Sequence, residues 1–274
     1  MKKFFFNFFW FLLLFSIIIH VWPLYQLYTG EYKQTVAGAE IYRSLLKSKK
    51  KSRSKKVLLG DSGAYQLFPN TIENDTINSL ACNQAISLVG HYILLNNYLQ
   101  AGNKADTVIM LFSPYTFRNN LDQVFTYHYF IKPFFIDEYK PLLTKTVYEQ
   151  VDKIPFYQLS HYPIILTSNW APDYIPNGNN YFTFLSPVAK EYLTKIKALS
   201  EKYHFSIEIL ATPLSITQKA TNNKINKNET LKTGLGKNFE SYFKHIIYLP
   251  DSNFIDKFHL KHPERYTEYY KSSF

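Results

Sequence analysis

Runs of apolar residues separated by polar connections follow the whole chain, and five of these runs have the length of strands. They lie at residues 56–61, 76–84, 106–114, 206–215 and 245–250. The runs are largely continuous rather than alternately polar and apolar, which is typical of strands buried on both faces of a parallel sheet. Apolar residues also recur with helical spacing over 85–102 and 186–205. Strands and helices therefore alternate along the chain.

Start and stop signals support the two helices. The first ends at Gly102, and the second begins with Ser186 as its expected N-cap and Pro187 as its first residue. A last helix is expected over 262–273, whereas 115–180 is long, aromatic and irregular, with a loop over 167–180. The alternation predicts an α/β fold, specifically a three-layer α/β/α, flavodoxin-like arrangement with a mostly parallel five-stranded sheet.

The longest apolar run precedes this domain. It covers residues 4–22, holds only three polar residues and follows Lys2 and Lys3. A helix of this length rises about 28 Å, close to the hydrocarbon thickness of a bilayer. The run is longer than the core of most cleavable signal peptides and no small-residue cleavage site follows directly, so we expect an uncleaved transmembrane anchor. A cleaved signal peptide and a buried helix remain alternatives.

The anchor sets the expected organisation and location. The two lysines predict a single-pass protein of the cell membrane with a cytoplasmic N-terminus and an extracytoplasmic domain. The chain then divides into a cytoplasmic tip (1–3), the anchor (4–22), a stalk with a basic linker (23–56) and the α/β domain (57–274).

The positive charge is concentrated in one segment. The net charge is +10, and residues 47–56 (KSKKKSRSKK) carry seven positive charges. This favours one local basic segment over a global nucleic-acid-binding surface, so no nucleic-acid partner is expected. The segment is either a solvated stalk or a contact for anionic head groups or an anionic polymer. No phosphate-binding glycine motif supports nucleotide chemistry.

Candidate chemistry begins where the first strand ends. Gly60-Asp61-Ser62-Gly63 is either a plain turn or a nucleophile presented at the tip of a strand. A serine nucleophile needs a base and a group that orients the base. Asp256 and His259 follow the fifth strand and are three residues apart, which predicts that they share one face of a helical turn. Ligands of parallel sheets bind beyond the carboxyl ends of the strands, where all three residues are expected.

Other histidines and the cysteine offer weaker alternatives. His262 is a second candidate base with poorer spacing from Asp256, and His259 has the alternative of being a packed core residue. Cys82 is the only cysteine, which excludes an intrachain disulfide, and its apolar surroundings favour a core position. Trp170 belongs either to an aromatic cap or to a sugar-binding groove. No metal site is predicted, because the remaining histidines lack a carboxylate or cysteine at ligand spacing, namely His91, His128, His161, His204 and His245.

The two motifs together resemble those of the SGNH, or GDSL, hydrolase superfamily. GDSGA at 60–64 is similar to its nucleophile block, and DKFHL at 256–260 is similar to its late Asp-x-x-His pair; the resemblance covers about residues 57–270. It implies that Ser62 is the nucleophile, His259 the general base and Asp256 its orienting partner. It also implies an oxyanion hole made by the backbone N–H of Ser62 and by a donor in 79–87 (SLACNQAIS), where Asn83 or Gln84 stands without the family's glycine.

The third block departs from the usual family pattern. LFSPYTF at 111–117 replaces the common Gly-x-Asn-Asp. This is similar to divergent membrane-anchored members, such as the proteins of lipoteichoic-acid D-alanylation and alginate O-acetylation. The resemblance implies a serine esterase or O-acyltransferase without a cofactor, acting on ester groups of a cell-envelope polysaccharide or polyol polymer beside a membrane-bound O-acyltransferase.

Two other functions remain open from the sequence. The first is a catalytically decayed protein of the same fold that docks a polymer or a membrane-bound O-acyltransferase. The second is a membrane-surface or nucleic-acid contact through residues 47–56, with the fold as passive mass.

Overall fold

The computed structural model of the chain describes residues 1–72, 76–174 and 184–273. Its centre is a parallel sheet in the order β2-β1-β3-β4, made of β1 (Lys56–Gly60), β2 (Ile77–Ser79), β3 (Thr107–Leu111) and β4 (Ser206–Leu210). The burial of β1 and β3 is nearly continuous, as expected for strands covered on both faces. The protein is therefore α/β with a mostly parallel sheet.

The helices, given in chain order, divide into α-helices and elements of 3-10 or π type. The α-helices are α1 (Lys2–Thr29), α2 (Tyr32–Thr35), α3 (Ala39–Ser48), α4 (Ser62–Leu67), α5 (Ser87–Gln100), α6 (Pro114–Arg118), α7 (Lys132–Phe134), α8 (Lys145–Val151), α9 (Pro163–Leu166), α10 (Pro187–Tyr203), α11 (Lys219–Asn222), α12 (Gly236–Lys244) and α13 (Glu264–Ser273). A π-helix covers η2 (Tyr127–Ile131), and 3-10 turns are η1 (Gln84–Ile86), η3 (Lys140–Leu142), η4 (Tyr157–Leu159), η5 (Ile216–Gln218), η6 (Lys227–Thr233) and η7 (Asp251–Asn253).

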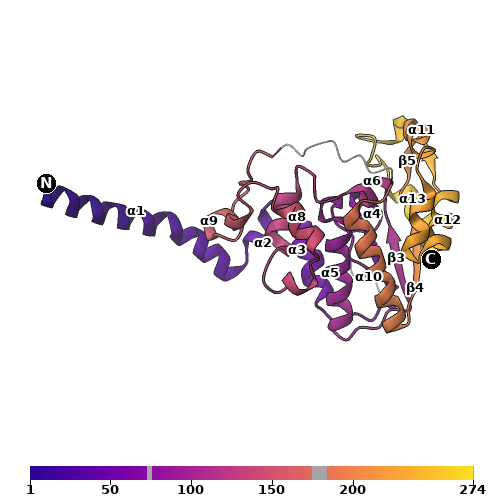
Figure 1. Cartoon of the computed structure of the whole chain (residues 1–274), viewed down its shortest axis with the longest axis horizontal. Helices are drawn as coiled ribbons and strands as arrows, with labels where there is room; N and C mark the ends of the chain where they lie inside the picture. The colour runs from indigo at the N-terminus through magenta and orange to yellow at the C-terminus, as the bar shows by residue number, and fades with distance from the viewer. Residues whose placement is uncertain (73–75, 175–183, 274) are drawn as a thin grey trace.

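Helices cover both faces of the sheet (Figure 1). Val57 and Leu59 point to the face packed by α5 and α10, whereas Leu58 points to the face packed by α4 and α13. The predicted cap of α10 is confirmed, because the Ser186 side chain accepts a hydrogen bond from the Ala189 N–H at 3.0 Å. The carboxyl ends of β1 and β3 thus lie between helical layers and open toward one edge.

The predicted single five-stranded sheet differs from the structure. Among the described residues the main sheet has four strands, and the fifth run contributes only β6 (Tyr248–Leu249). β6 pairs with β5 (Leu214–Ser215) in a separate two-stranded parallel sheet. The fourth run is interrupted because Pro213 has no N–H to donate to a ladder, so β4 ends at Leu210 and β5 begins anew.

The N-terminal helix extends away from the rest of the molecule (Figure 1). α1 is long and apolar enough to cross a membrane, with a mean hydropathy of 2.2 over an 18-residue window of which none is buried. This length and composition are those of a membrane anchor or of a signal sequence. It touches the domain through α9, where the rings of His20 and Tyr162 are 6.0 Å apart.

Part of the expected stalk belongs to the packed domain. α3 lies against α5, and its residues Ile41 and Leu45 are buried in the core. The basic segment after it is also held by the domain: Lys49 pairs with Glu138 at 2.6 Å, and Lys51 donates to the Gly102 carbonyl at 3.2 Å. Several of the positive charges at 47–56 thus interact with the protein itself.

The segment expected to be irregular folds into short helices, from α6 to α9. None of them exceeds seven residues, which is why no helical period stands out in the sequence. The predicted loop over 167–180 begins directly after α9, and its residues 175–180 lie outside the described part of the chain.

Candidate active site

Ser62 is the first residue of α4, directly beyond the carboxyl end of β1. Asp61 is the N-cap of this helix, and its Oδ1 accepts hydrogen bonds from the Gly63 N–H at 3.1 Å and the Ala64 N–H at 3.2 Å. Gly60 is required because a Cβ there would lie 2.3 Å from the Ala64 Cβ. The tight strand-to-helix turn therefore depends on glycine and aspartate and presents Ser62 at the edge of the sheet.

The Asp61 carboxylate also joins the first and third strands. Its Oδ2 accepts hydrogen bonds from the Ser113 N–H at 2.7 Å and from the Thr116 hydroxyl at 2.9 Å. Asp61 is only 2% exposed, so these four hydrogen bonds replace the water that a buried carboxylate would otherwise need. The sequence suggests the turn but not this second contact, which forms between segments that are 52 residues apart.

Asp256 and His259 lie on a loop, and the predicted helical turn is wrong. The loop is closed by an isolated antiparallel bridge between Phe254 and Leu260, and Lys257 has a left-handed backbone (φ 72°). The Asp256 side chain shapes the loop, because its Oδ1 accepts from the N–H groups of Phe258 at 3.1 Å and His259 at 2.9 Å. These short-range bonds to the backbone compete with helix formation and are typical of aspartate in turns.

Gln66 holds this loop against α4, the helix that begins with Ser62. Its Oε1 accepts from the Leu260 N–H at 2.9 Å, and its Nε2 donates to the Leu260 carbonyl at 3.4 Å. Gln66 lies one turn after Ser62 on α4, so one short helix carries both Ser62 and the residue that fixes the loop of His259. In the sequence, the only signal for this role is the i, i+4 spacing from Ser62 to Gln66.

The three predicted residues form one hydrogen-bonded chain. The Ser62 Oγ lies 2.9 Å from the His259 Nε2, and the His259 Nδ1 lies 2.7 Å from the Asp256 Oδ2. The first distance joins residues 197 positions apart in sequence. In this geometry the His259 Nε2 can take the proton of the Ser62 hydroxyl. The His259 Nδ1 keeps its own proton and donates it in a hydrogen bond to the Asp256 carboxylate.

The Asp256 carboxyl remains an acceptor in this chain. Burial alone would raise its pKa, but the hydrogen bonds from the His259 side chain and from the His259 and Phe258 N–H groups outweigh burial and lower it. Because the pKa of Asp256 is lowered, the ionised carboxylate is the form present near neutral pH.

The predicted oxyanion donors lie beside Ser62. Among the residues that the structure describes, no partner accepts a hydrogen bond from the backbone N–H of Ser62 or Gln84, whereas the Asn83 N–H donates to the Cys82 sulfur. The Asn83 Oδ1 accepts from the Ala85 N–H at 2.9 Å, which fixes the turn at the start of η1. Ser113, in the LFSPYTF segment, donates its N–H to Asp61 and is not free to act as an oxyanion donor.

These groups line a common cavity of about 420 Å³. Its walls are formed by Ser62, Asn83, Gln84, Gln123, Val124, Phe125 and His259. Val124 and Phe125 are both more than half exposed and were not singled out by the sequence, because they lie in the segment without periodicity. We call these wall residues, together with Asp256, the catalytic edge.

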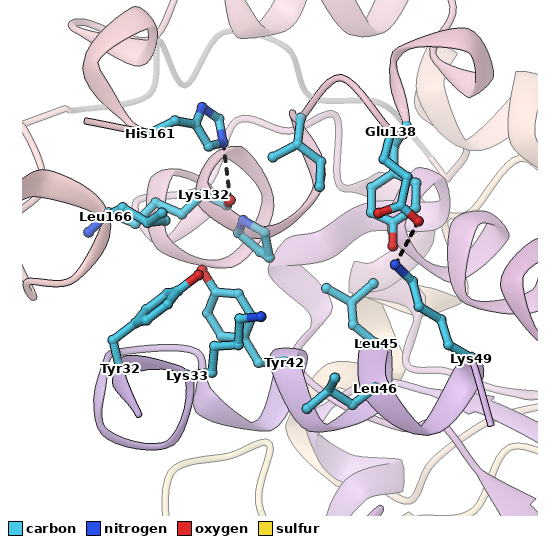
Figure 2. A pocket seen from close by; sticks show the side chains of 13 residues that line it. Tyr32, Lys33, Tyr42, Leu45, Leu46, Lys49, Lys132, Glu138, His161 and Leu166 are labelled. Atoms are coloured by element: carbon cyan, nitrogen blue, oxygen red, sulfur yellow. Dashed lines mark hydrogen bonds and ion pairs between the residues drawn. The ribbon is translucent and has the colours of Figure 1, made fainter. Parts of the chain in front are cut away.

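A second, smaller hollow of about 170 Å³ lies beside α2, the short helix that follows α1, and Figure 2 shows the side chains that line it. It lies between α2–α3 and the segment from Lys132 to Tyr139, and its ionisable groups include the Lys49–Glu138 pair. None of its 13 lining residues is a serine, threonine or cysteine, so this hollow offers no hydroxyl or thiol nucleophile apart from tyrosine.

The other candidate residues lie elsewhere. Cys82 is buried, and burial raises the pKa of its thiol, so it is not an activated nucleophile. His262 pairs with Glu264 at 3.3 Å rather than with Asp256. Within the described ranges, no three His, Cys, Asp or Glu side chains are grouped to hold a metal ion.

Comparison with known proteins gives no assignment. No family model, no curated protein and no solved structure matches this chain. Its function must therefore be argued from the geometry of the site.

Proposed function

We propose that this protein is an SGNH-type serine esterase or O-acyltransferase that acts on ester groups of a cell-envelope polysaccharide or polyol polymer. The observation that carries the proposal is the hydrogen-bonded chain from Ser62 through His259 to Asp256. Such a chain activates an otherwise weak nucleophile, because the base takes the proton as the oxygen attacks.

In the proposed reaction the Ser62 Oγ attacks the ester carbonyl carbon while its proton passes to the His259 Nε2. The carbonyl oxygen becomes an oxyanion, and the imidazolium formed is stabilised by the Asp256 carboxylate. Collapse breaks the ester C–O bond, the leaving alkoxide takes the proton from His259, and the acyl group stays on Ser62. Water or a sugar or polyol hydroxyl then attacks the acyl carbon and loses its proton to the His259 Nε2. The bond between the acyl carbon and the Ser62 Oγ breaks, and the Ser62 Oγ takes the proton back from His259.

The oxyanion would be held by backbone N–H groups. The amides of Ser62 and of Asn83 or Gln84 are the proposed donors, since all three residues line the cavity. The amides of Ser62 and Gln84 also lack other partners among the described residues, whereas the Asn83 N–H would have to leave the Cys82 sulfur. One such donor typically contributes about 3 kcal/mol to the transition state. Backbone donors need no particular side chain, so this arrangement is compatible with the absence of the usual glycine and asparagine.

The strand order supports a flavodoxin-like, three-layer fold. The order β2-β1-β3-β4 matches the first four positions of the flavodoxin-like 2-1-3-4-5 sheet. We propose that residues 57–274 form a three-layer SGNH-like domain in which β5 and β6 stand in place of a fifth strand of the main sheet.

The proposed location is the outer side of the cell membrane. α1 has the length and hydropathy of an anchor, and Lys2 and Lys3 favour a cytoplasmic N-terminus. An extracytoplasmic domain held at the membrane would meet envelope polymers and a membrane-bound O-acyltransferase partner.

Active-site labelling of the full-length protein in detergent micelles tests the enzymatic proposal. A fluorophosphonate probe should form a bond between its phosphorus and the Ser62 Oγ with loss of fluoride, and Ser62→Ala should abolish labelling. Ser87→Ala is a matched control, because Ser87 is a buried serine that donates to the Asn119 carbonyl. Equal labelling of wild type and Ser62→Ala, or no labelling of either, would contradict the proposal.

A catalytically decayed binding protein is the second candidate function. One observation favours it. Ser113 stands in the block where SGNH hydrolases usually have an oxyanion-hole asparagine, and its N–H donates to Asp61. This candidate predicts polymer or acyltransferase binding that survives Ser62→Ala together with no turnover of p-nitrophenyl acetate. Turnover that is lost in Ser62→Ala would exclude it.

A further inference from the structure

A cluster of exposed aromatic and aliphatic side chains lies beside the anchor. Phe156, Leu159, Tyr162 and Trp170 are each between 42% and 58% exposed, although they belong to a segment with a well-packed interior. We call these four residues the aromatic patch. Large exposed apolar side chains gathered on one segment indicate a contact surface.

The patch is level with the end of the apolar part of α1. The Tyr162 ring lies 6.0 Å from the ring of His20, and α9, which follows Tyr162, packs against α1. Trp22 and Tyr25 stack at 5.5 Å on the next turn of α1. Two segments about 140 residues apart thus bring aromatic rings to one level, as in the aromatic belts of membrane proteins.

Contacts with Tyr127 and with the buried Lys132 hold the patch in place. The Trp170 ring lies 6.3 Å from Phe156 and 5.9 Å from Tyr127. The Lys132 ammonium donates to the carbonyls of Ser168 and Trp170 at 2.7 and 3.0 Å. The Lys132 carbonyl is in turn within 3.2 Å of the His161 Nε2 (Figure 2), so both sides of the patch are tied to one buried residue.

Phe156 adds a second unusual feature. Its backbone is left-handed (φ 56°), which is unfavourable for a bulky residue, and its ring is nevertheless 58% exposed. Neither local backbone preference nor core burial accounts for this placement. A surface that the ring enters would account for it.

We propose that the aromatic patch inserts into the interface between head groups and acyl chains of the same bilayer that holds α1. The occupant we infer is phospholipid rather than a protein partner, because the patch is continuous with the anchor and combines tryptophan, tyrosine and aliphatic side chains. Two points of contact then fix how the domain stands on the membrane and hold the catalytic edge in one direction. The inference depends on the proposed anchor.

Fluorescence quenching by brominated phosphatidylcholine tests the inference with the full chain in liposomes. Trp10→Phe with Trp22→Phe leaves Trp170 as the single tryptophan, since the chain has three. Bromine near the head-group end of the acyl chains should lower its emission at least about twofold. The matched control adds Trp170→Phe and Tyr269→Trp, because Tyr269 is half exposed on α13, at the other end of the molecule from α1 (Figure 1). The control emission should stay unchanged.

A third variant separates the anchor from the patch. Trp22→Phe with Trp170→Phe leaves Trp10, which lies within α1. Quenching of Trp10 by bromine deep in the acyl chains, without quenching of Trp170 beyond the control, would overturn the inference and leave the anchor standing. This result would favour a protein partner, rather than phospholipid, as the molecule that contacts the aromatic patch. Absence of quenching at both positions would overturn the anchor and the inference together.

Discussion

Ionisable side chains have different surroundings in two parts of the domain. At the catalytic edge they are partly exposed, whereas in residues 127–170, which we call the anchor side, several are buried. At the catalytic edge, the side chains of His259 and Asp256 are 33% and 51% exposed and are paired with each other. On the anchor side, burial lowers the pKa of Lys132 to about 8 and the pKa of His128 to about 4. The partly exposed pair at the edge is in contact with solvent, whereas burial on the anchor side disfavours the charged forms of Lys132 and His128.

This difference indicates where mutations should affect chemistry and where they should affect stability. Residues of the edge should change turnover with little effect on folding, because they are partly exposed and joined by hydrogen bonds. Buried titratable residues should change stability and its pH dependence with little effect on turnover.

Of three single substitutions, Asp256→Asn should lower kcat the most. An amide nitrogen in place of Oδ2 cannot accept the proton of the His259 Nδ1, so the imidazole takes the wrong tautomer. We expect kcat for p-nitrophenyl acetate to fall by about 10³-fold or more, with an unchanged melting temperature. Glu264→Gln is the matched control, because it removes the neighbouring carboxylate–imidazole pair with His262. A comparable loss in that control would contradict the assignment of Asp256.

Gln66→Leu should have an intermediate effect. It removes both hydrogen bonds to Leu260 and leaves the loop of His259 free to shift, so kcat should fall by about tenfold. As control, Gln100→Leu removes a hydrogen bond to the Tyr203 hydroxyl on the opposite part of the domain and should leave kcat unchanged. A parallel loss of thermal stability and of activity in Gln66→Leu would point to a merely structural role. Unchanged fluorophosphonate labelling rates would show that the loop does not need this residue.

His91→Leu should have the smallest effect on activity and should change the pH dependence of stability. His91 is fully buried against Phe112, with ring centroids 4.6 Å apart, and burial lowers its pKa to about 3. The unfolded chain, with an ordinary pKa of 6.5, binds this proton more readily, so the wild type loses stability as pH falls from 6.5 toward 3.

Urea unfolding at pH 7.5 and pH 5 measures this contribution. The decrease in the free energy of unfolding between the two pH values should be smaller in His91→Leu by about 2 kcal/mol. An identical decrease in both proteins would mean that the buried imidazole does not titrate between the folded and unfolded states as proposed.

The sequence predicts the parts of the site that depend on local order. The run ending in Gly60-Asp61-Ser62 already places a hydroxyl at the tip of a strand, and Asp256 with His259 follows the last short strand. The structure brings these side chains together, but on a loop with a left-handed Lys257 rather than on a helical turn. Spacing alone does not distinguish a helical turn from an aspartate-shaped loop, since both bring residues three apart together.

Contacts between distant segments could not be predicted in this way. The bonds from Asp61 to Ser113 and from Gln66 to Leu260 join residues 52 and 194 positions apart. The sequence predicts a stalk where α3 lies, because a helix with one apolar face next to a basic segment does not reveal which distant helix covers that face; in the structure the partner is α5. Pro213 divides one apolar run into two strands of different sheets, which hydrophobicity alone does not reveal.

A double-mutant cycle on Ser62 and His259 tests the central claim most directly. If the hydroxyl and the imidazole 2.9 Å away act as one unit, then Ser62→Ala, His259→Ala and the double variant should all lose turnover to the same extent. Losses that multiply in the double variant would show that the two side chains act independently and would contradict the account.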